Sequence, residues 1–175
     1  MPKLRGSVMI LDDVEQLIGL FNQTFVSFNT ILVEGDEEPI YLPADQRFSQ
    51  HRVVFAHGFY ASALHEIAHW CIAGNARRQL EDYGYWYHPD GRDQSLQQKF
   101  ERVEVKPQAI ECAFSKVAGR TFQVSVDNLS GYQSDRQAFS QAVQQQFLDF
   151  QKQGFPSRAQ QFIEALAKLR ASLSG

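Results

Sequence analysis

Apolar residues recur at helical spacing near the start of the chain. Between residues 12 and 28 they fall on one face of a helix, which Asp12 or Asp13 can cap at its beginning. That face consists of Val14, Leu17, Ile18, Phe21 and Phe25. Further helices are predicted over residues 58–73, 94–105, 109–118, 134–153 and 157–173. Gly74 is expected to close the helix over residues 58–73, and Pro107 to kink or restart the chain between residues 105 and 109.

Short β-branched or alternating runs predict a minor sheet. They cover residues 30–33, 40–42, 52–55 and 122–126, and an aromatic, glycine-containing stretch at 83–93 reads as a packed loop. No repeat or linker divides the sequence. The pattern therefore predicts one domain over residues 1–175, of the α+β class, predominantly helical with a minor β-sheet.

Composition narrows the class of protein. The 175 residues are 43% apolar and 21% charged, with a formal charge of -3, which is typical of a globular domain. This mild acidity argues against direct nucleic-acid binding, which needs a basic face. No apolar run is long enough to span a membrane, and residues 1–11 lack a signal-peptide core. Cys71 and Cys112 form no CxxC pattern, which favours a reducing cytoplasm.

Candidate chemistry lies in the second predicted helix, at His65-Glu66-Ile67-Ala68-His69. Residues four apart sit one turn above each other, with about 5–6 Å between their Cβ atoms. Two imidazoles can therefore bind one metal, while Glu66 leans towards a bound water or substrate as a catalytic base. The alternative is an exposed helix face with two solvated histidines. The apolar and small residues around the motif argue against it, because a wholly solvated helix would be more polar. The segment is thus predicted to be a zincin-like HExxH helix.

The third ligand is less sharply indicated. The metzincin extension requires Gly at position 72 and His at position 75, where this sequence has Ile72 and Asn75. A carboxylate from a later helix is the alternative. Glu101 and Glu104 lie on one face and Gln108 follows on it. Glu104 is favoured because its valine neighbours suggest burial, Glu101 is second, and either taken alone could be a surface charge.

Three other histidines compete for a role. His57 lies about two helical turns before His65 and could border the site, whereas His51 looks like a loop residue. His88-Pro89-Asp90 spells half of a facial triad, but no histidine follows it to complete the set. Two imidazoles and one carboxylate suit Zn(II), which would imply hydrolysis, and also Fe(II), which would imply oxygen activation.

Several strings of the sequence closely resemble the elongation factor P hydroxylase family. They are FAHGFYASALHEIAHWCIAG at 55–74, YGYWY at 83–87, PDGR at 89–92 and VEVKPQA at 103–109. The similarity runs from about residue 33 to residue 129. It implies a cytoplasmic enzyme that hydroxylates the β-lysylated lysine of elongation factor P, the last step of that modification. It also implies a divalent metal on His65, His69 and Glu104, Fe(II) with Zn(II) as the alternative, and Glu66 as a base or proton carrier. The sequence shows no motif for an organic cofactor.

Other residues are candidates for the substrate pocket. They are His57, Tyr60, Glu101, Gln108, Asp90 and Arg92. Aromatic rings, among them Phe59, Trp70 and Trp86, could shield the site, although ordinary core packing explains at least half of them. Two further hypotheses stay open: a gluzincin-like zinc metallopeptidase, and a protein whose metal only braces its fold.

Overall fold

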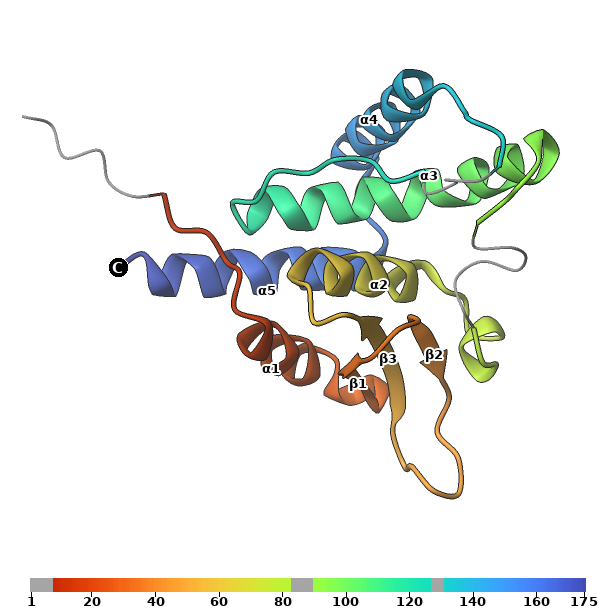
Figure 1. Ribbon diagram of the computed structural model, residues 1–175. Helices are drawn as coiled ribbons and strands as arrows, with labels where there is room; N and C mark the ends of the chain where they lie inside the picture. The colour runs from red at the N-terminus through yellow and green to blue at the C-terminus, as the bar shows by residue number, and fades with distance from the viewer. Residues whose placement is uncertain (1–7, 83–89, 127–130) are drawn as a thin grey trace, which may run out of the picture.

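The computed structural model describes residues 8–82, 90–126 and 131–175. Within these ranges the chain forms five α-helices, two short 3-10 helices and a three-stranded sheet (Figure 1). The predicted α+β class with a predominance of helix is confirmed. None of the helices in the described ranges has the length and apolar character needed to cross a membrane.

The N-terminal part builds one helix and the sheet. Helix α1 (Val14–Thr24) begins at Asp13, whose side chain accepts the Gln16 N–H at 3.0 Å, as the sequence predicts. The 3-10 helix η1 (Val26–Phe28) leads into β1 (Thr30–Gly35), followed by β2 (Ile40–Leu42) and β3 (His51–Ala56). Strand β3 lies in the middle, parallel to β1 and antiparallel to β2. Three of the four predicted strands are therefore confirmed.

Helix α2 (Tyr60–Ile72) follows β3 after a tight connection and packs on the sheet, α3 and α5. Figure 1 shows it between the sheet and α3. Trp70 and Ile67 are buried in a core that α1, the sheet and α5 complete. At the end of α2, the guanidinium of Arg158 donates to the carbonyl oxygens of Trp70 and Ala73. These contacts satisfy carbonyls that a helix end leaves without partners, so the position of α2 is fixed along its length.

Helix α3 (Gln94–Val117) runs unbroken through Pro107. The expected restart at this residue is therefore wrong. A proline inside a helix costs about 3 kcal/mol, but α3 packs against α2, α4 and α5. Burial along so long a helix offsets the loss of one backbone hydrogen bond. One rigid helix consequently carries all the residues between 94 and 117.

The predicted strand at residues 122–126 is also wrong, because no strand forms there. Side chains, not a neighbouring strand, bind its backbone. Gln108 accepts the Ser125 N–H at 3.0 Å and donates to the Ser125 carbonyl at 2.7 Å. Arg136 donates to the Val124 carbonyl and Arg92 to the Val126 carbonyl. The backbone groups that would join a sheet are thus tied to α3 and to the start of α4.

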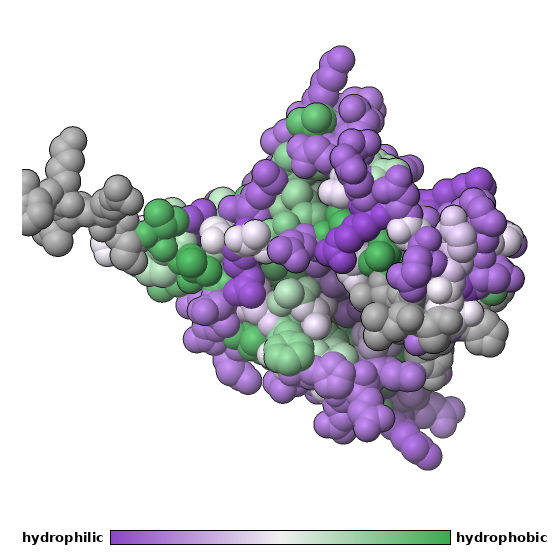
Figure 2. All heavy atoms as spheres, turned by 45° about the horizontal axis from the view of Figure 1, so that its top comes forward, coloured by the Kyte–Doolittle hydropathy of each residue, from purple (hydrophilic) through white to green (hydrophobic). Residues whose placement is uncertain are grey.

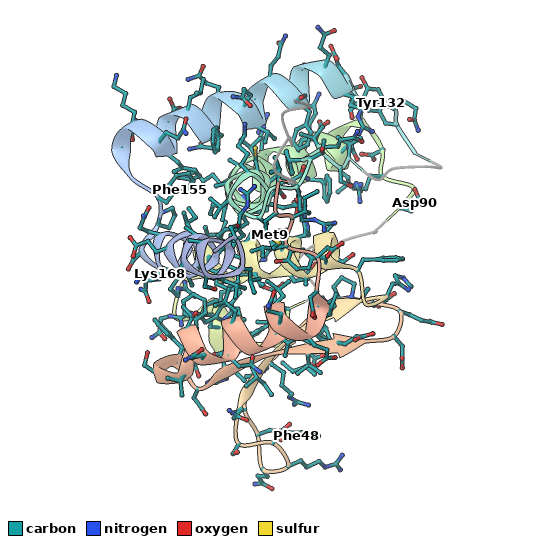
Figure 3. The ribbon with its side chains drawn as sticks, turned by 90° about the vertical axis from the view of Figure 1, so that its left-hand side faces the viewer. Met9, Phe48, Asp90, Tyr132, Phe155 and Lys168 are labelled. Carbon is teal, nitrogen blue, oxygen red and sulfur yellow. The ribbon has the colours of Figure 1, made fainter. Side chains whose placement is uncertain are left out.

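Two further helices complete the fold, α4 (Arg136–Gln153) and α5 (Ser157–Leu173). Between α3 and α4 lies a second apolar cluster, which includes Val124, Phe139 and Phe147. Phe155, in the turn between α4 and α5, packs on both clusters (Figure 3). On the face in Figure 2 polar side chains predominate, and apolar ones gather at its centre and towards its left side.

Candidate metal centre

Helix α2 presents His65 and His69 on one side, one turn apart. Their ring centroids are 4.7 Å apart and their Nε2 atoms 3.2 Å apart. Both rings are partly buried, with 26% and 13% of the side chains exposed. The residues around them on α2, including Leu64 and Ala68, are buried in the core. The histidines therefore occupy a rigid, half-sheltered strip of the helix, not a freely solvated face.

Glu104 reaches this pair from α3. Its Oε1 lies 2.8 Å from His69 Nε2, and its Oε2 lies 3.7 Å from His65 Nε2. The side chain is only 2% exposed. One nitrogen from each histidine and a Glu104 oxygen all lie within 4.8 Å of one another. The structure thus brings together the three residues that the sequence predicts as metal ligands.

The protonation of these groups reflects their crowding. Burial alone would raise the pKa of Glu104, but His69, His65 and the Gln108 amide outweigh it and lower the pKa to about 2. Burial lowers the pKa of His65, yet the carboxylates of Glu111 and Glu104 hold that pKa well above its usual value. A divalent cation bound here would neutralise the Glu104 carboxylate and would separate the Nε2 atoms of His65 and His69. The donor set therefore fits a metal of the Zn(II) or Fe(II) type.

Further side chains of α3 support these donors. Gln108 is buried and donates from Nε2 to Glu104 Oε2 at 3.1 Å, while its other contacts bind the backbone of Ser125. Glu111 Oε2 lies 2.8 Å from His65 Nδ1. Gln108, a candidate for the substrate pocket, thus holds the Glu104 carboxylate in place, and its contact with the substrate stays a prediction. Its amide bridges the candidate ligand and the segment before residue 127.

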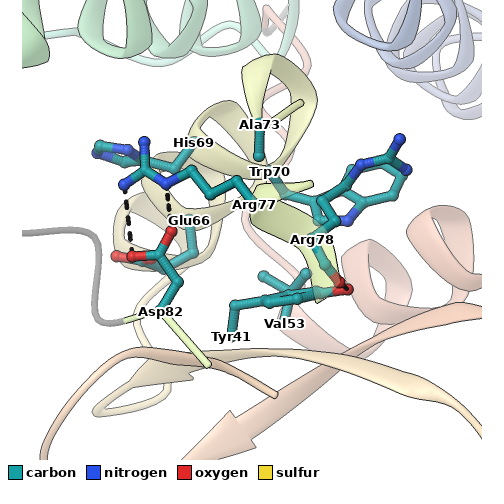
Figure 4. A pocket seen from close by; sticks show the side chains of 9 residues that line it. All are labelled: Tyr41, Val53, Glu66, His69, Trp70, Ala73, Arg77, Arg78 and Asp82. Carbon is teal, nitrogen blue, oxygen red and sulfur yellow. Dashed lines mark hydrogen bonds and ion pairs between the residues drawn. The ribbon is translucent and has the colours of Figure 1, made fainter. Parts of the chain in front are cut away.

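Glu66 projects from α2 on the side of a small pocket (Figure 4). His69 lines the same pocket, and Tyr41 and Val53 of the sheet lie across from them. An ion pair between Arg77 and Asp82 forms part of its wall. Burial raises the pKa of Glu66, although the two histidines act in the opposite sense. A carboxyl group beside a metal donor can accept and donate protons during a reaction.

The runner-up ligand, Glu101, lies one turn before Glu104 on α3. It is not part of the three-residue donor group. Its side chain is partly buried, and its Oε1 has no hydrogen-bond partner within the described ranges. His57 is exposed, with φ of 59° in the connection between β3 and α2, and its ring lies 6.1 Å from that of Phe59. The geometry therefore favours Glu104 and leaves His57 outside the donor group.

Three other candidate pocket residues have different surroundings. Tyr60 is buried under the guanidinium of Arg120, 4.7 Å from its ring centroid. Arg92 is only 2% exposed, donates to Gln97 at 2.7 Å and stacks over Phe100. Asp90 is exposed and accepts the N–H of Gly91. The guanidinium of Arg92 is therefore engaged inside the protein.

The shielding aromatics separate into different groups. Trp70 belongs to the core, where its ring packs against Phe21, Phe25 and Phe28. Phe59 is 63% exposed. The expectations for residues 83–89, which include Trp86 and His88, lie outside the described ranges.

Glu111 is the supporting residue that the sequence reasoning missed. The signal for it was present in the spacing of α3. Glu101, Glu104, Gln108 and Glu111 follow one another at intervals of three, four and three residues. These intervals place all four on one face of a helix, whose neighbouring positions from Ala109 to Phe114 are otherwise buried and largely apolar. A polar row along such a helix indicates a site with several members.

Comparison with known proteins agrees with this geometry. The family described as Elongation factor P hydroxylase matches residues 20–172. A relative from Haemophilus influenzae, named Elongation factor P lysine hydroxylase, is 51% identical over 154 residues, which cover 87% of this chain and 86% of the relative. The hydroxylase hypothesis is thereby favoured over the metallopeptidase. By the extent of both matches, this chain belongs to the elongation factor P hydroxylase family.

Proposed function

We propose that this protein hydroxylates the β-lysylated lysine of elongation factor P, with a divalent metal bound by His65, His69 and Glu104. The convergence of two imidazoles and one buried carboxylate from α2 and α3 carries the proposal. Membership of the hydroxylase family supports the reaction and the partner. A translation factor as substrate also supports a cytoplasmic location.

Hydroxylation of an unactivated C–H bond needs an oxidant that no side chain provides. Fe(II), the metal we propose, would supply redox chemistry with dioxygen. Two histidines and a carboxylate leave other coordination positions free for reactants. The residues of the chain hold the donors in place, since α2 is locked into the core and Gln108 fixes the Glu104 carboxylate. Such preorganisation keeps the reacting groups aligned without further conformational cost.

Glu66 is proposed as the catalytic proton carrier. Insertion of one oxygen atom into a C–H bond sends the second oxygen of dioxygen to water, which consumes two protons and two electrons. The electrons come from a reductant supplied to the enzyme, and a group beside the metal must deliver protons. Glu66 shares a pocket with His69 and has a raised pKa. Glu66→Gln is expected to retain metal and lose hydroxylation.

The substrate arm carries ammonium groups, so carboxylates near the centre are its expected contacts. Glu101 is the best placed, because it is one turn from Glu104 and offers a buried oxygen without a hydrogen-bond partner in the described part of the chain. Asp90 is exposed, but it lies farther from Glu104 in the sequence. Glu101→Gln should therefore weaken use of the modified factor while leaving metal bound.

The decisive experiment is an intact-mass assay on β-lysylated elongation factor P. Purified protein, Fe(II), dioxygen and a reductant should add one oxygen atom to the factor, and removal of dioxygen should abolish the addition. Glu104→Gln should be inactive, whereas Glu164→Gln, an exposed position on α5, should match the wild type. Unchanged mass with the wild-type protein would refute the proposal. Oxygen-independent cleavage of a peptide bond would instead support the gluzincin-like alternative.

A further inference from the structure

We infer that Glu111 is a positioning residue for the metal centre: its carboxylate accepts the Nδ1–H of His65 and so directs the Nε2 lone pair at the metal. The inference deepens the proposed function and rests on the proposed metal site. It concerns a residue outside the donor set of His65, His69 and Glu104. The supporting observation is the 2.8 Å separation between Glu111 Oε2 and His65 Nδ1.

The two nitrogens of the His65 ring face different carboxylates of α3. Nε2 lies towards Glu104 and His69, and Nδ1 lies against Glu111. A neutral imidazole carries a proton on one nitrogen only, and the hydrogen bond made by that nitrogen selects the tautomer. A carboxylate accepts but does not donate. Glu111 therefore favours the tautomer with hydrogen on Nδ1, which leaves Nε2 free to bind a cation.

The position of Glu111 in α3 keeps its carboxylate close to His65 Nδ1. It follows Glu104 by seven residues, or about two helical turns, so the ligand and the positioning residue project from the same face of one helix. The side chain is only 13% exposed, and its backbone neighbours Ile110 and Cys112 are buried. An ordinary surface ion pair would have neither this shelter nor a fixed partner. Rotation of the His65 ring is thereby restrained from both edges.

Glu111 as a direct metal ligand is the competing explanation. The donor group uses His65 Nε2, and Glu111 lies at the opposite nitrogen of that ring. One metal ion cannot take both His65 Nε2 and a carboxylate on Nδ1 as neighbours, because the ring lies between them. The arrangement matches the general pattern in which a metal-bound histidine donates its other N–H to a carboxylate.

Zinc affinity of the purified protein, measured by competition with a chromophoric chelator, tests the inference without use of activity. Glu111→Leu should bind Zn(II) about 10- to 100-fold more weakly than the wild type. Glu111→Gln keeps an acceptor oxygen and should lose less. Glu111→Asp keeps the charge but withdraws the carboxylate, so it should resemble Glu111→Leu. Glu164→Gln serves as the matched control and should bind like the wild type.

A second measurement reports on the ring itself. In zinc-loaded, ¹⁵N-labelled protein, the His65 Nδ1–H should give a slowly exchanging NMR signal that Glu111→Leu and Glu111→Asp lack. Wild-type zinc affinity in both of these variants would overturn the inference alone. Zinc loss in Glu111→Gln as complete as in Glu104→Gln would overturn it in favour of a ligand role. Absence of zinc binding by the wild type would refute the proposed centre as well.

Discussion

Helices α2 and α3 meet at the candidate metal centre, but they bury different kinds of side chain. The buried residues of α2 are nearly all apolar, and Ile67, Ala68 and Trp70 are typical of them. Those of α3 include four polar ones: Gln97, Glu104, Gln108 and Ser115. Apolar burial stabilises a fold directly, whereas a buried polar group costs free energy unless it is hydrogen-bonded.

Partners of the polar residues explain how α3 tolerates them. Gln97 binds Arg92 and the Val126 carbonyl, and Glu104 binds His69 and Gln108. By contrast, α2 leaves the Trp70 Nε1 atom buried without a hydrogen-bond partner in the described ranges. Packing thus fixes α2, while a network of hydrogen bonds fixes the polar face of α3. Substitutions of the buried apolar residues of α2 should mainly affect folding, and those on this polar face of α3 should mainly affect the site.

The largest expected effect is that of Trp70→Ala on α2. Trp70 is 3% exposed and packs on the rings of Phe21, Phe25 and Phe28. Its truncation should lower the free energy of unfolding by about 3–5 kcal/mol, as for other buried aromatics. Urea denaturation of the metal-free protein measures this. Val26→Ala, at a site 73% exposed, is the control and should change little. If Trp70→Ala lowered the free energy of unfolding by less than Gln108→Leu does, packing would not be the main contribution of α2.

Metal addition should give the next largest effect. A ligand that binds only the folded state stabilises it by about 2.7 kcal/mol at 100 times its dissociation constant. Zn(II) at that concentration should raise the melting temperature of the wild type, and Glu104→Gln should lose the shift. Glu101→Gln is the matched variant, one turn away on α3, and should keep it. If Glu101→Gln loses the shift and Glu104→Gln keeps it, Glu101 is the third ligand.

The same contrast explains what the sequence could reveal. On α2, the two histidines are four residues apart, so local periodicity alone predicts their convergence. The presence of the other helices and of the three strands was also predictable, because burial of apolar side chains follows the helical or strand period. Glu104 was preferred over Glu101 on the apolar character of its neighbours, and the structure places it 2.8 Å from His69.

Features that depend on contacts between distant segments were not predictable. Residues 122–126 alternate like a strand, yet Gln108, Arg136 and Arg92 bind their backbone groups. Pro107 signals a break, yet tertiary packing carries α3 through it. The spacing of α3 places Glu111 on the polar face of the helix, but its partner, His65, is identified only by the distance between them. In each case the interaction partner lies far away in the sequence, and the periodicity of neighbouring residues does not identify it.

Gln108→Leu tests the network of α3 directly. The substitution removes an amide that binds Glu104 Oε2 and both backbone groups of Ser125. Buried groups left without partners cost about 1–3 kcal/mol, so the free energy of unfolding should fall by that amount. Zinc affinity should fall as well, because Glu104 loses its support. Gln98→Leu, an exposed position on the same helix, is the control in the same denaturation and zinc titrations. Wild-type zinc affinity in Gln108→Leu would show that Glu104 needs no such support.

The smallest effect is expected at high pH, from the one phenol that α2 buries. Burial raises the pKa of Tyr60 to about 12 from its ordinary 10.0, even though Arg120 opposes the change. The folded state therefore holds the phenolic proton more tightly than the unfolded state. The corresponding stability is complete below pH 10 and is lost as the pH rises from 10 towards 12.

Tyr60→Phe cannot ionise and should escape this loss. Relative to its own value at pH 8, the wild type should lose at most about 1.4 kcal/mol more than Tyr60→Phe at pH 11. Urea denaturation at the two pH values measures the difference, with Tyr132→Phe at an exposed tyrosine as the control. Equal losses in the wild type and Tyr60→Phe would mean that the phenol of Tyr60 reaches solvent. Helix α2 would then bury no ionisable phenol, and its difference from α3 would be larger than described above.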